Sequence, residues 1–373
     1  MPGPLAHLKI IEFGGIGPGP FCGMVLSDLG AEVIRLERPA DAGRAPSRPV
    51  LLRNRRSVAV DLKTPDGVET ALRLVEGADA AFEGFRPGVA ERLGIGPDTC
   101  LARNPRLVYG RMTGWGQEGP YAREAGHDIN YIGLSGALAA VGPADGDPVV
   151  PLNMVGDFGG GGMLLALGIT SALLHAQATG QGQVVDAAMT DGSAPLLATA
   201  LNMMATGTWT DRRGSNTIDG AAPYYRAYRC ADGRHMAVGC VEPQFYAHML
   251  TVLGLARDPL FAAQEDRAAW PAMAERLEAV FAERTRDAWT AAFDGHNACV
   301  TPVLSLTEAP GHPHNLARGT YTSLPGGTTQ PAPAPRFSAT PAAPPRPAPK
   351  TGADTEEVLR EAGITAVPGD GTL

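Results

Sequence analysis

The chain has 373 residues, of which 44% are hydrophobic and 19% are charged, and its formal net charge is −8. This composition is that of a globular protein with a sizeable core, and the acidic balance excludes a general nucleic-acid-binding surface, which would be basic. No uninterrupted apolar run reaches the roughly 18 residues of a membrane span, so we expect no membrane association and no signal peptide. The five cysteines form no CxxC pair, which predicts reduced thiols and a cytoplasmic location.

The first part of the chain alternates strand-like and helix-like segments. Residues 8–13 and 32–37 are apolar runs typical of strands, and they flank a helix predicted over residues 21–29. Further strands are predicted at residues 57–62, 80–83 and 107–112, with a helix at 67–75. Strands and helices that alternate in this way indicate a parallel sheet covered by helices, and hence a large Rossmann-like α/β domain.

The character of the chain changes after a long apolar helix, predicted over residues 163–178 with Gly180 as its C-cap, and a strand at 184–188. Residues 190–230 are rich in Thr, Asn, Asp, Gly and Tyr, which predicts a connecting region. A smaller α+β domain follows. Its predicted elements are a strand at 235–239, a helix at 244–253, two helices within 267–293 and a strand at 299–304.

A proline-rich segment follows the small domain. Residues 325–349 hold nine prolines, which exclude a regular helix or a central strand, so we expect an extended arm that crosses back over the first domain. A short helix is predicted at 355–362. These patterns predict a large domain formed by residues 1–189 and 330–373. Residues 190–329 would hold the linkers and the small domain that completes the active site.

The glycine-rich turn after the first strand has two interpretations. Its Gly-Ile-Gly-Pro-Gly-Pro sequence at residues 15–20 resembles a dinucleotide-binding fingerprint, and Glu37 falls where a ribose-binding acid is expected. Proline, however, stands where the third glycine of that fingerprint belongs. We therefore favour a tight turn in a βαβ unit over an NAD(P) site.

Residues 35–92 are a basic part of an acidic chain, with eleven Arg or Lys against nine Asp or Glu, a net charge of +2. For any single basic residue here, a solvated surface position is the better interpretation. As a group they lie at strand ends and turns, where α/β sheets bind ligands, and they suit the phosphates of a nucleotide-bearing substrate. The group comprises Arg38, Arg53, Arg55, Arg56, Lys63, Arg86 and Arg92.

His127 and Asp157 are the candidate proton carriers. A histidine ordinarily titrates near neutrality, but His127 is open to the alternative of a core histidine satisfied by hydrogen bonds. Asp157 precedes a helix, so it is open to the alternative of a helix cap. The glycine run at 159–162 lets a ligand approach the backbone, whose N–H groups can stabilise negative charge on a substrate oxygen. If the two side chains converge on one carbon, they can remove a proton from one face and return it on the other.

Two further features of the sequence have both a functional and an ordinary interpretation. Glu242 lies between a strand and a helix of the small domain, and is either a surface acid or a carboxylate that orients the His127 ring. Seven methionines are either core filler or an adaptable surface for an acyl chain. They are Met154, Met163, Met189, Met203, Met204, Met236 and Met249.

Over nearly the whole chain, motifs in the same order resemble those of the family III CoA-transferases, the CaiB/BaiF superfamily. The matching motifs include Gly-Phe-Arg-Pro-Gly at 84–88, Thr-Gly-Trp-Gly-Gln at 113–117, Gly-His-Asp-Ile-Asn-Tyr at 126–131, the Asp157 motif, Asp-Gly-Ala-Ala-Pro-Tyr at 219–224 and Glu-Pro-Gln-Phe-Tyr at 242–246. The motif that contains His127 is similar to the racemase branch of the family, because the transferase branch usually has an aromatic residue at this position.

This resemblance implies an isomerase of lipid and fatty acid metabolism that interconverts (R)- and (S)-2-methylacyl-CoA thioesters by 1,1-proton transfer through an enolate. It makes His127 and Asp157 the acid–base pair, with Glu242 in support of His127. It implies no metal and no cofactor, since CoA is part of the substrate, and it implies an interlocked homodimer with the active site between the large domain of one subunit and the small domain of the other. The implied CoA contacts are Arg38, Val60, Asp61, Leu62, Lys63, Gly84, Phe85, Arg86, Pro87, Gly88, Arg92, Gly126, His127, Asp128, Ile129, Asn130 and Tyr131.

Three other functions remain open from the sequence. The nearest is an acyl-CoA:carboxylate CoA-transferase, in which Asp157 acts as the nucleophile and forms an anhydride with the acyl group. His127 argues against it, because the transfer does not require a histidine there. An NAD(P) oxidoreductase depends on the first turn alone. A CoA-binding protein without activity leaves the pair of His127 and Asp157 unexplained.

Overall fold

The computed structural model describes residues 2–324 and 326–364. Residue 1, Pro325 of the predicted arm and residues 365–373 lie outside the described residues. The chain forms two compact units. Unit 1 comprises Met1–Ala137, Leu152–Leu196 and Asn315–Leu373, and unit 2 comprises Leu138–Pro151 and Leu197–His314.

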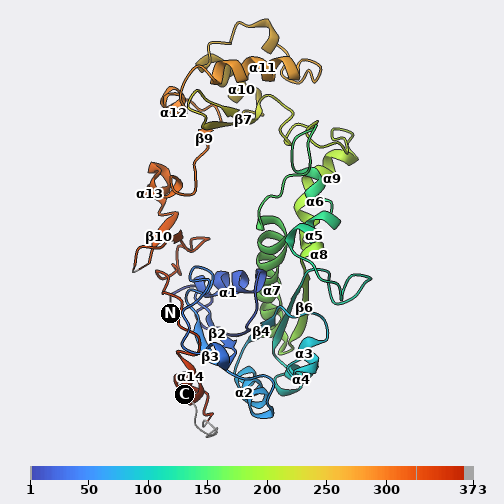
Figure 1. Ribbon diagram of the computed structural model, residues 1–373, viewed down its shortest axis with the longest axis vertical. Helices are drawn as coiled ribbons and strands as arrows, with labels where there is room; N and C mark the ends of the chain where they lie inside the picture. The colour runs from blue at the N-terminus through green and yellow to red at the C-terminus, as the bar shows by residue number, and fades with distance from the viewer. Residues whose placement is uncertain (1, 325, 365–373) are drawn as a thin grey trace. The chain divides into compact units, whose positions relative to one another are not determined.

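A six-stranded parallel sheet forms the centre of unit 1 (Figure 1), as the alternation of strands and helices predicts. Its strand order is β3-β2-β1-β4-β5-β6. The strands are β1 (Lys9–Phe13), β2 (Glu32–Glu37), β3 (Arg56–Ala59), β4 (Ala80–Glu83), β5 (Val108–Thr113) and β6 (Gln183–Ala188). Ile11 of β1 lies opposite Ile34 on one side and Ala81 on the other. The order therefore reverses between β1 and β4, and the loops that leave these strands diverge and open a crevice at their carboxyl ends.

The alternation of side chains along each strand gives this sheet two apolar faces. Ile10 is buried in the core that contains residues of α1 and α7, whereas its neighbour Ile11 is buried in the core that contains residues of α2 and α4. The helices are α1 (Pro18–Asp28), α7 (Leu164–Thr179), α2 (Pro65–Glu76) and α4 (Pro97–Arg103). Prolines occupy the first turns of α1, α2 and α4, where their missing N–H is not needed. Both faces of the sheet are thus covered, and ligands can reach it only at its edges.

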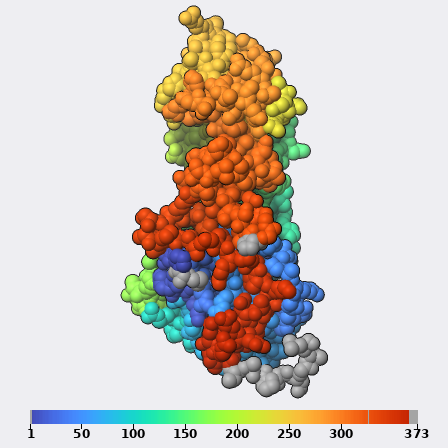
Figure 2. Space-filling view, turned by 90° about the vertical axis from the view of Figure 1, so that its left-hand side faces the viewer, coloured from blue at the N-terminus to red at the C-terminus, as the bar shows by residue number. Residues whose placement is uncertain are grey.

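The C-terminal segment lies across the N-terminal elements of unit 1 (Figure 2), which confirms the arm that the prolines predict. The hairpin of β10 (Tyr321–Ser323) and β11 (Thr329–Pro331) comes first. The backbone N–H of Asn54 then donates to the carbonyl of Arg346, and the N–H of Asp354 to that of Ser57. Helix α14 (Thr355–Glu361) follows and packs beside β3.

Unit 2 contains a three-stranded antiparallel sheet of β7 (Tyr225–Arg229), β8 (His235–Gly239) and β9 (Val300–Pro302). Helices α10 (Pro243–Val252), α11 (Trp270–Phe281) and α12 (Arg286–Phe293) supply much of its core, in which Tyr228 stacks on Phe281. The predicted connecting region, 190–230, is more structured than expected, because it also holds α9 (Ala198–Ala205) and β7. In the part of the chain that the structure describes, the remaining helices are α3 (Val89–Arg92), α5 (Asp128–Leu134), α6 (Ala137–Ala140), α8 (Met189–Ser193) and α13 (Pro313–Arg318), besides short 3₁₀ turns.

The long apolar helix of unit 1 begins earlier than predicted. α7 ends at Gly180, whose φ of 78° forms the left-handed C-cap that the sequence predicts. At its other end α7 continues directly from a π-helix, η2 (Met154–Met163). The combined segment, Met154–Thr179, is long and apolar enough to cross a membrane, but the core helices of soluble proteins pass the same test and the signal is weak. Leu165 and Ile169 of this segment are fully buried in the core of unit 1.

Three arginines of the predicted anion-binding group are instead part of the fold. Arg53 forms a buried ion pair with Asp28, and the fully buried Arg55 donates to Glu12 at 3.0 Å. Arg56 binds Glu32 at 2.7 Å and Glu361 of α14. Their charges are neutralised inside unit 1, so the prediction that these three side chains bind a ligand is wrong.

The buried pair of Arg55 and Glu12 gives a prediction for stability. Arg55→Ala leaves Glu12 with Arg35 as its remaining cationic partner, and breaking a buried pair costs about 3–5 kcal/mol. We expect a fall of that size in the free energy of unfolding, measured by urea denaturation followed by circular dichroism. Arg44→Ala is the control, since Arg44 is exposed and forms a surface ion pair with Asp41, and its expected effect is under about 1 kcal/mol. Equal effects of the two substitutions would contradict the structural role of Arg55.

Candidate active site

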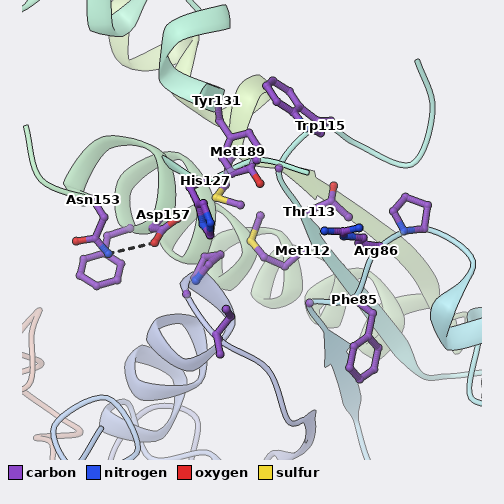
Figure 3. Close-up of a pocket in the computed structure, with 18 of the residues that line it drawn as sticks. Phe85, Arg86, Met112, Thr113, Trp115, His127, Tyr131, Asn153, Asp157 and Met189 are labelled. Carbon is purple, nitrogen blue, oxygen red and sulfur yellow. Dashed lines mark hydrogen bonds between the residues drawn. The ribbon is translucent and has the colours of Figure 1, made fainter. Parts of the chain in front are cut away.

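A pocket of about 500 Å³ opens at the carboxyl ends of strands β1, β4, β5 and β6 in unit 1. Its walls are residues 16–18 after β1, 84–87 after β4, 112–115 at the end of β5, and Met189 after β6. His127 and Asp157 both line it, and Figure 3 shows their side chains next to one another. The two candidate proton carriers that the sequence singles out therefore share one pocket at the reversal of strand order, the usual ligand position in such sheets.

His127 immediately precedes helix α5. Its backbone N–H donates to Oδ1 of Asn130 at 3.0 Å, which fixes the backbone at the start of the helix. The side chain is exposed and lines the pocket. The alternative of a core histidine is therefore wrong, and the exposed ring can exchange a proton with a ligand in the pocket.

Asp157 is the fourth residue of π-helix η2, so the alternative of a helix cap is wrong as well. Its carboxylate is half-buried, and Oδ2 accepts a hydrogen bond from Nδ2 of Asn153 at 3.1 Å. Burial is the largest influence on Asp157 and raises its pKa, the Asn153 bond lowers it, and the charge of Asp128 raises it further. The net rise moves the carboxyl toward the range in which it can act both as an acid and as a base.

The glycine run has a different role from the one expected. Gly160, Gly161 and Gly162 are buried, and a Cβ atom on Gly162 would lie 2.5 Å from the carbonyl oxygen of Pro18. The run therefore allows η2 to pack closely against α1 and α8. The expectation that it admits a ligand is wrong for these three glycines.

The first glycine-rich turn contacts Asp157. Gly17 has a φ of 70°, and a Cβ atom there would stand 3.6 Å from Oδ2 of Asp157. Glu37, the candidate ribose-binding acid, already accepts hydrogen bonds from Arg35 and from the hydroxyl of Ser57. Both observations favour the tight turn over a dinucleotide site.

The implied CoA contacts fall into three groups in unit 1. Gly84, Phe85, Arg86, Pro87, Gly126, His127 and Tyr131 line the pocket. Arg38 and residues 60–63 follow β2 and β3 at the same edge of the sheet, where the N–H of Val60 donates to the carbonyl of Glu37. Gly88, Arg92, Asp128, Ile129 and Asn130 lie on the loops and helices next to the pocket without lining it.

Several lining residues are absent from the sequence-based set. Met112 and Trp115 follow from the position of β5, since residues at the carboxyl end of a parallel strand face the ligand crevice. Trp115 packs edge-on against Tyr131 with 4.7 Å between ring centroids, so the pair forms an aromatic wall. Asn153 and Arg48 lie on loops, and no signal in the sequence places them in the pocket.

Glu242 and part of the methionine group belong to unit 2. Glu242 is exposed and precedes α10, and its predicted support of His127 stays a prediction. Met236 and Met249 are fully buried in the core of unit 2, so their predicted contribution to an acyl surface is wrong. Met189 lines the pocket of unit 1 and is available to an acyl chain.

Glu83, the last residue of β4, is buried beneath the loop that carries Arg86. Its Oε2 accepts the N–H of Phe85 at 2.5 Å, and its Oε1 accepts from Nε of Arg111 at 3.2 Å. Burial raises the pKa of Glu83 to about 7, although Phe85 and Arg111 lower it. Glu83 thus connects the pocket loop to the sheet.

Comparison with known proteins gives consistent matches over the length of the chain. The model of CoA-transferase family III matches residues 5–355. The alpha-methylacyl-CoA racemases of Mus musculus and Homo sapiens are 45% and 44% identical, each over 97% of this chain and 94% of the relative. A crystal structure of a CAIB/BAIF family protein from Brucella suis superposes with a TM-score of 0.84 at 28% identity, and covers 97% of this chain and 100% of that one.

The raised pKa of Glu83 predicts how stability depends on pH. Because the pKa is about 7 in the folded chain against an ordinary 4.5, the folded state holds the proton more tightly, and its free energy of unfolding falls as pH rises from about 4.5 to about 7. Glu83→Gln removes this dependence. We therefore expect the variant to gain stability relative to the unaltered chain between pH 5 and pH 8, measured by urea denaturation at both pH values.

Glu69→Gln is the control for this measurement. Glu69 is exposed, and its hydrogen bond to Arg103 holds its pKa below the ordinary value, so its contribution is already complete above pH 5. A gap between Glu83→Gln and the unaltered chain that is the same at pH 5 and pH 8 would contradict the raised pKa.

Proposed function

The chain belongs to CoA-transferase family III, and on that premise we propose that it interconverts the R and S epimers of 2-methylacyl-CoA thioesters. The observation that carries the proposal is the presence of His127 and Asp157 in one pocket. A reaction that removes a proton from one face of a carbon and returns it on the other needs two such groups. The similarity to alpha-methylacyl-CoA racemases at 44–45% identity supports it.

For the S epimer, His127 takes the α-proton as a neutral base, with Glu242 in support of its ring. The bonding pair moves onto the thioester oxygen and forms an enolate, which backbone N–H donors near the start of η2 stabilise. Asp157 in its neutral form then protonates the opposite face of the α-carbon. The raised pKa of Asp157 supports this step, because a carboxyl with an ordinary pKa is almost wholly ionised near neutral pH.

For the R epimer the roles are reversed, so that the Asp157 carboxylate takes the proton and the His127 imidazolium returns one. The thioester already acidifies the α-carbon, and the proposed chemistry uses only these side chains and backbone donors. Binding of the CoA moiety supplies the energy that positions the reacting carbon.

We place the CoA phosphates at the carboxyl ends of β2, β3 and β4. Arg38, Lys63, Arg86 and Arg92 are exposed there, and none has an ion pair among residues 2–324 and 326–364. Free guanidinium and ammonium groups are the donors that phosphates require. Val60 is buried and would contribute through its backbone.

The runner-up is CoA transfer between carboxylic acids. It uses the same pocket, with the Asp157 carboxylate as nucleophile. The position of the His127 ring in the pocket favours the racemase, since the transfer leaves that ring without a function.

We also propose that the chain acts as an interlocked homodimer in the cytoplasm. The support for the dimer is helix α7, which carries large apolar side chains on its exposed side as well as in the core: Leu165 and Ile169 are fully buried, whereas Leu167 and Leu174 are 61% and 69% exposed. Large apolar side chains that are exposed together often mark an interface. The support for the location is that all five cysteines are free thiols.

Incubation of a single epimer of a 2-methylacyl-CoA in D₂O tests the function. We expect deuterium at the α-carbon and appearance of the other epimer, with no acceptor acid present, measured by NMR and chiral chromatography. We expect His127→Ala to slow both by about 10²–10⁴-fold, the usual contribution of a positioned acid–base group. His7→Ala is the matched control, since His7 is an exposed histidine that does not line the pocket. Transfer of CoA to an added carboxylate without deuterium exchange would overturn the proposal in favour of the runner-up.

The dimer is tested by a charge on the exposed side of α7. We expect the double variant Leu167→Asp/Leu174→Asp to sediment as a monomer at micromolar concentration, where the unaltered chain sediments as a dimer. Ala102→Asp, an exposed position of α4 on the other face of the sheet, should leave the sedimentation unchanged. The proposed interface would be contradicted if the unaltered chain sediments as a monomer, or if the double variant still sediments as a dimer.

A further inference from the structure

Asp128 is a buried acid placed between the two proton carriers. It follows His127 directly in the chain, and its side chain is only 7% exposed. Its Oδ1 accepts the backbone N–H of Asp157 at 2.6 Å, across 29 residues of sequence. One side chain thus connects the segment that carries His127 to the segment that carries Asp157.

The local backbone is shaped to allow this contact. Gly156 precedes Asp157, and a Cβ atom on it would lie 2.5 Å from Oδ1 of Asp128. Any other residue would push the carboxylate away from η2. The glycine therefore serves the approach of Asp128 to the backbone of Asp157.

The second oxygen of the carboxylate is left without a partner. Oδ2 of Asp128 is buried and accepts no hydrogen bond from residues 2–324 or 326–364. An unpaired buried oxygen on a charged group is costly, so its retention calls for a functional explanation. The charge of this carboxylate acts on the group next to it.

The group next to it is the carboxyl of Asp157. The charge of Asp128 raises the pKa of Asp157 after the larger effect of burial, whereas Asn153 and His127 lower it. The charged groups on the other elements packed against η2 have partners elsewhere. The charge of Asp191 of α8 acts on Asp186 of β6, Arg111 of β5 interacts with Glu83, and Asp28 of α1 pairs with Arg53. Tyr131 of α5 is neutral, and the charge of Asp157 raises its pKa after the larger effect of burial.

We propose that Asp128 is a positioning residue for the epimerisation, which holds the backbone of Asp157 beside His127 and places a negative charge next to the Asp157 carboxyl. The proposal rests on the proposed function of the same site. It assigns two separable roles to one side chain. The hydrogen bond from Asp157 N–H sets the geometry, and the negative charge sets the proton affinity.

Asp128→Asn separates the two roles. The amide oxygen of Asn still accepts the N–H of Asp157, but the negative charge is gone. We expect the acidic limb of the profile of kcat/KM against pH to move to lower pH, because the pKa of Asp157 falls when the neighbouring charge is removed. We expect the same movement for both epimers. In either direction the pair of His127 and Asp157 holds one proton in total, and the two starting states differ only in which of the two residues holds it.

Asp128→Ala removes both roles and is compared with Asp128→Asn. Loss of a hydrogen bond to a charged group costs about 1.5–3 kcal/mol, so we expect kcat/KM to fall by a further factor of about 10–100. The Asn variant rescues this part of the loss. Asp186→Asn is the matched control: it also removes one carboxylate from unit 1, but that carboxylate accepts the N–H of Gln117, and the acidic limb should stay in place.

The outcomes distinguish this inference from the proposed function. If the unaltered chain exchanges no α-proton in D₂O, the proposed function fails. If the unaltered chain epimerises and Asp128→Asn lowers activity at every pH without moving the acidic limb, Asp128 has a structural role only and the inference fails. A limb that moves in Asp128→Asn and not in Asp186→Asn supports it, with circular dichroism and sedimentation to show that each variant is folded.

Discussion

The close contact between η2 and α1 is the interaction on which the site depends. Gly162 allows η2 to approach the carbonyl of Pro18, and Phe158 stacks on Phe21 with 4.3 Å between ring centroids. Through this contact the turn after β1 and the carboxylate of Asp157 share one wall of the pocket. A larger side chain in place of Gly162 would separate η2 from α1 and move Asp157 away from the crevice.

Buried ion pairs of β1 also fix the position of the start of α1. Glu12 of β1 binds both Arg35 and Arg55, and Arg55 also donates to the carbonyl of Pro20. These pairs are costly to desolvate and contribute little net stability. Their effect is on geometry, because the start of α1 can take only the position in which the buried guanidinium is satisfied.

The sequence predicts the parallel sheet well and singles out His127 and Asp157, which the structure places in one pocket, because apolar periodicity and motif spacing are local properties. It fails where a property depends on tertiary contacts. Arg53 and Arg55 have the same composition signal as Arg86, yet two are buried and one is exposed to the pocket. The π-helix that sets the orientation of Asp157 has no sequence signature, and the partnerless oxygen of Asp128 becomes evident only when the surrounding side chains are in place.

The crossing of the C-terminal arm over β3 has a consequence for biosynthesis. Unit 2 is an insertion within unit 1, since Asn54 and Ser57 receive their backbone partners from residues 346 and 354. On a ribosome, the N-terminal strands therefore emerge long before the segment that covers their edge, whereas the core of unit 2 is synthesised without interruption. Unit 2 can complete its fold first, and the sheet of unit 1 must wait with an open edge. The order of folding is then the reverse of the order in which the two units begin, and chaperone protection is most needed during the interval in between.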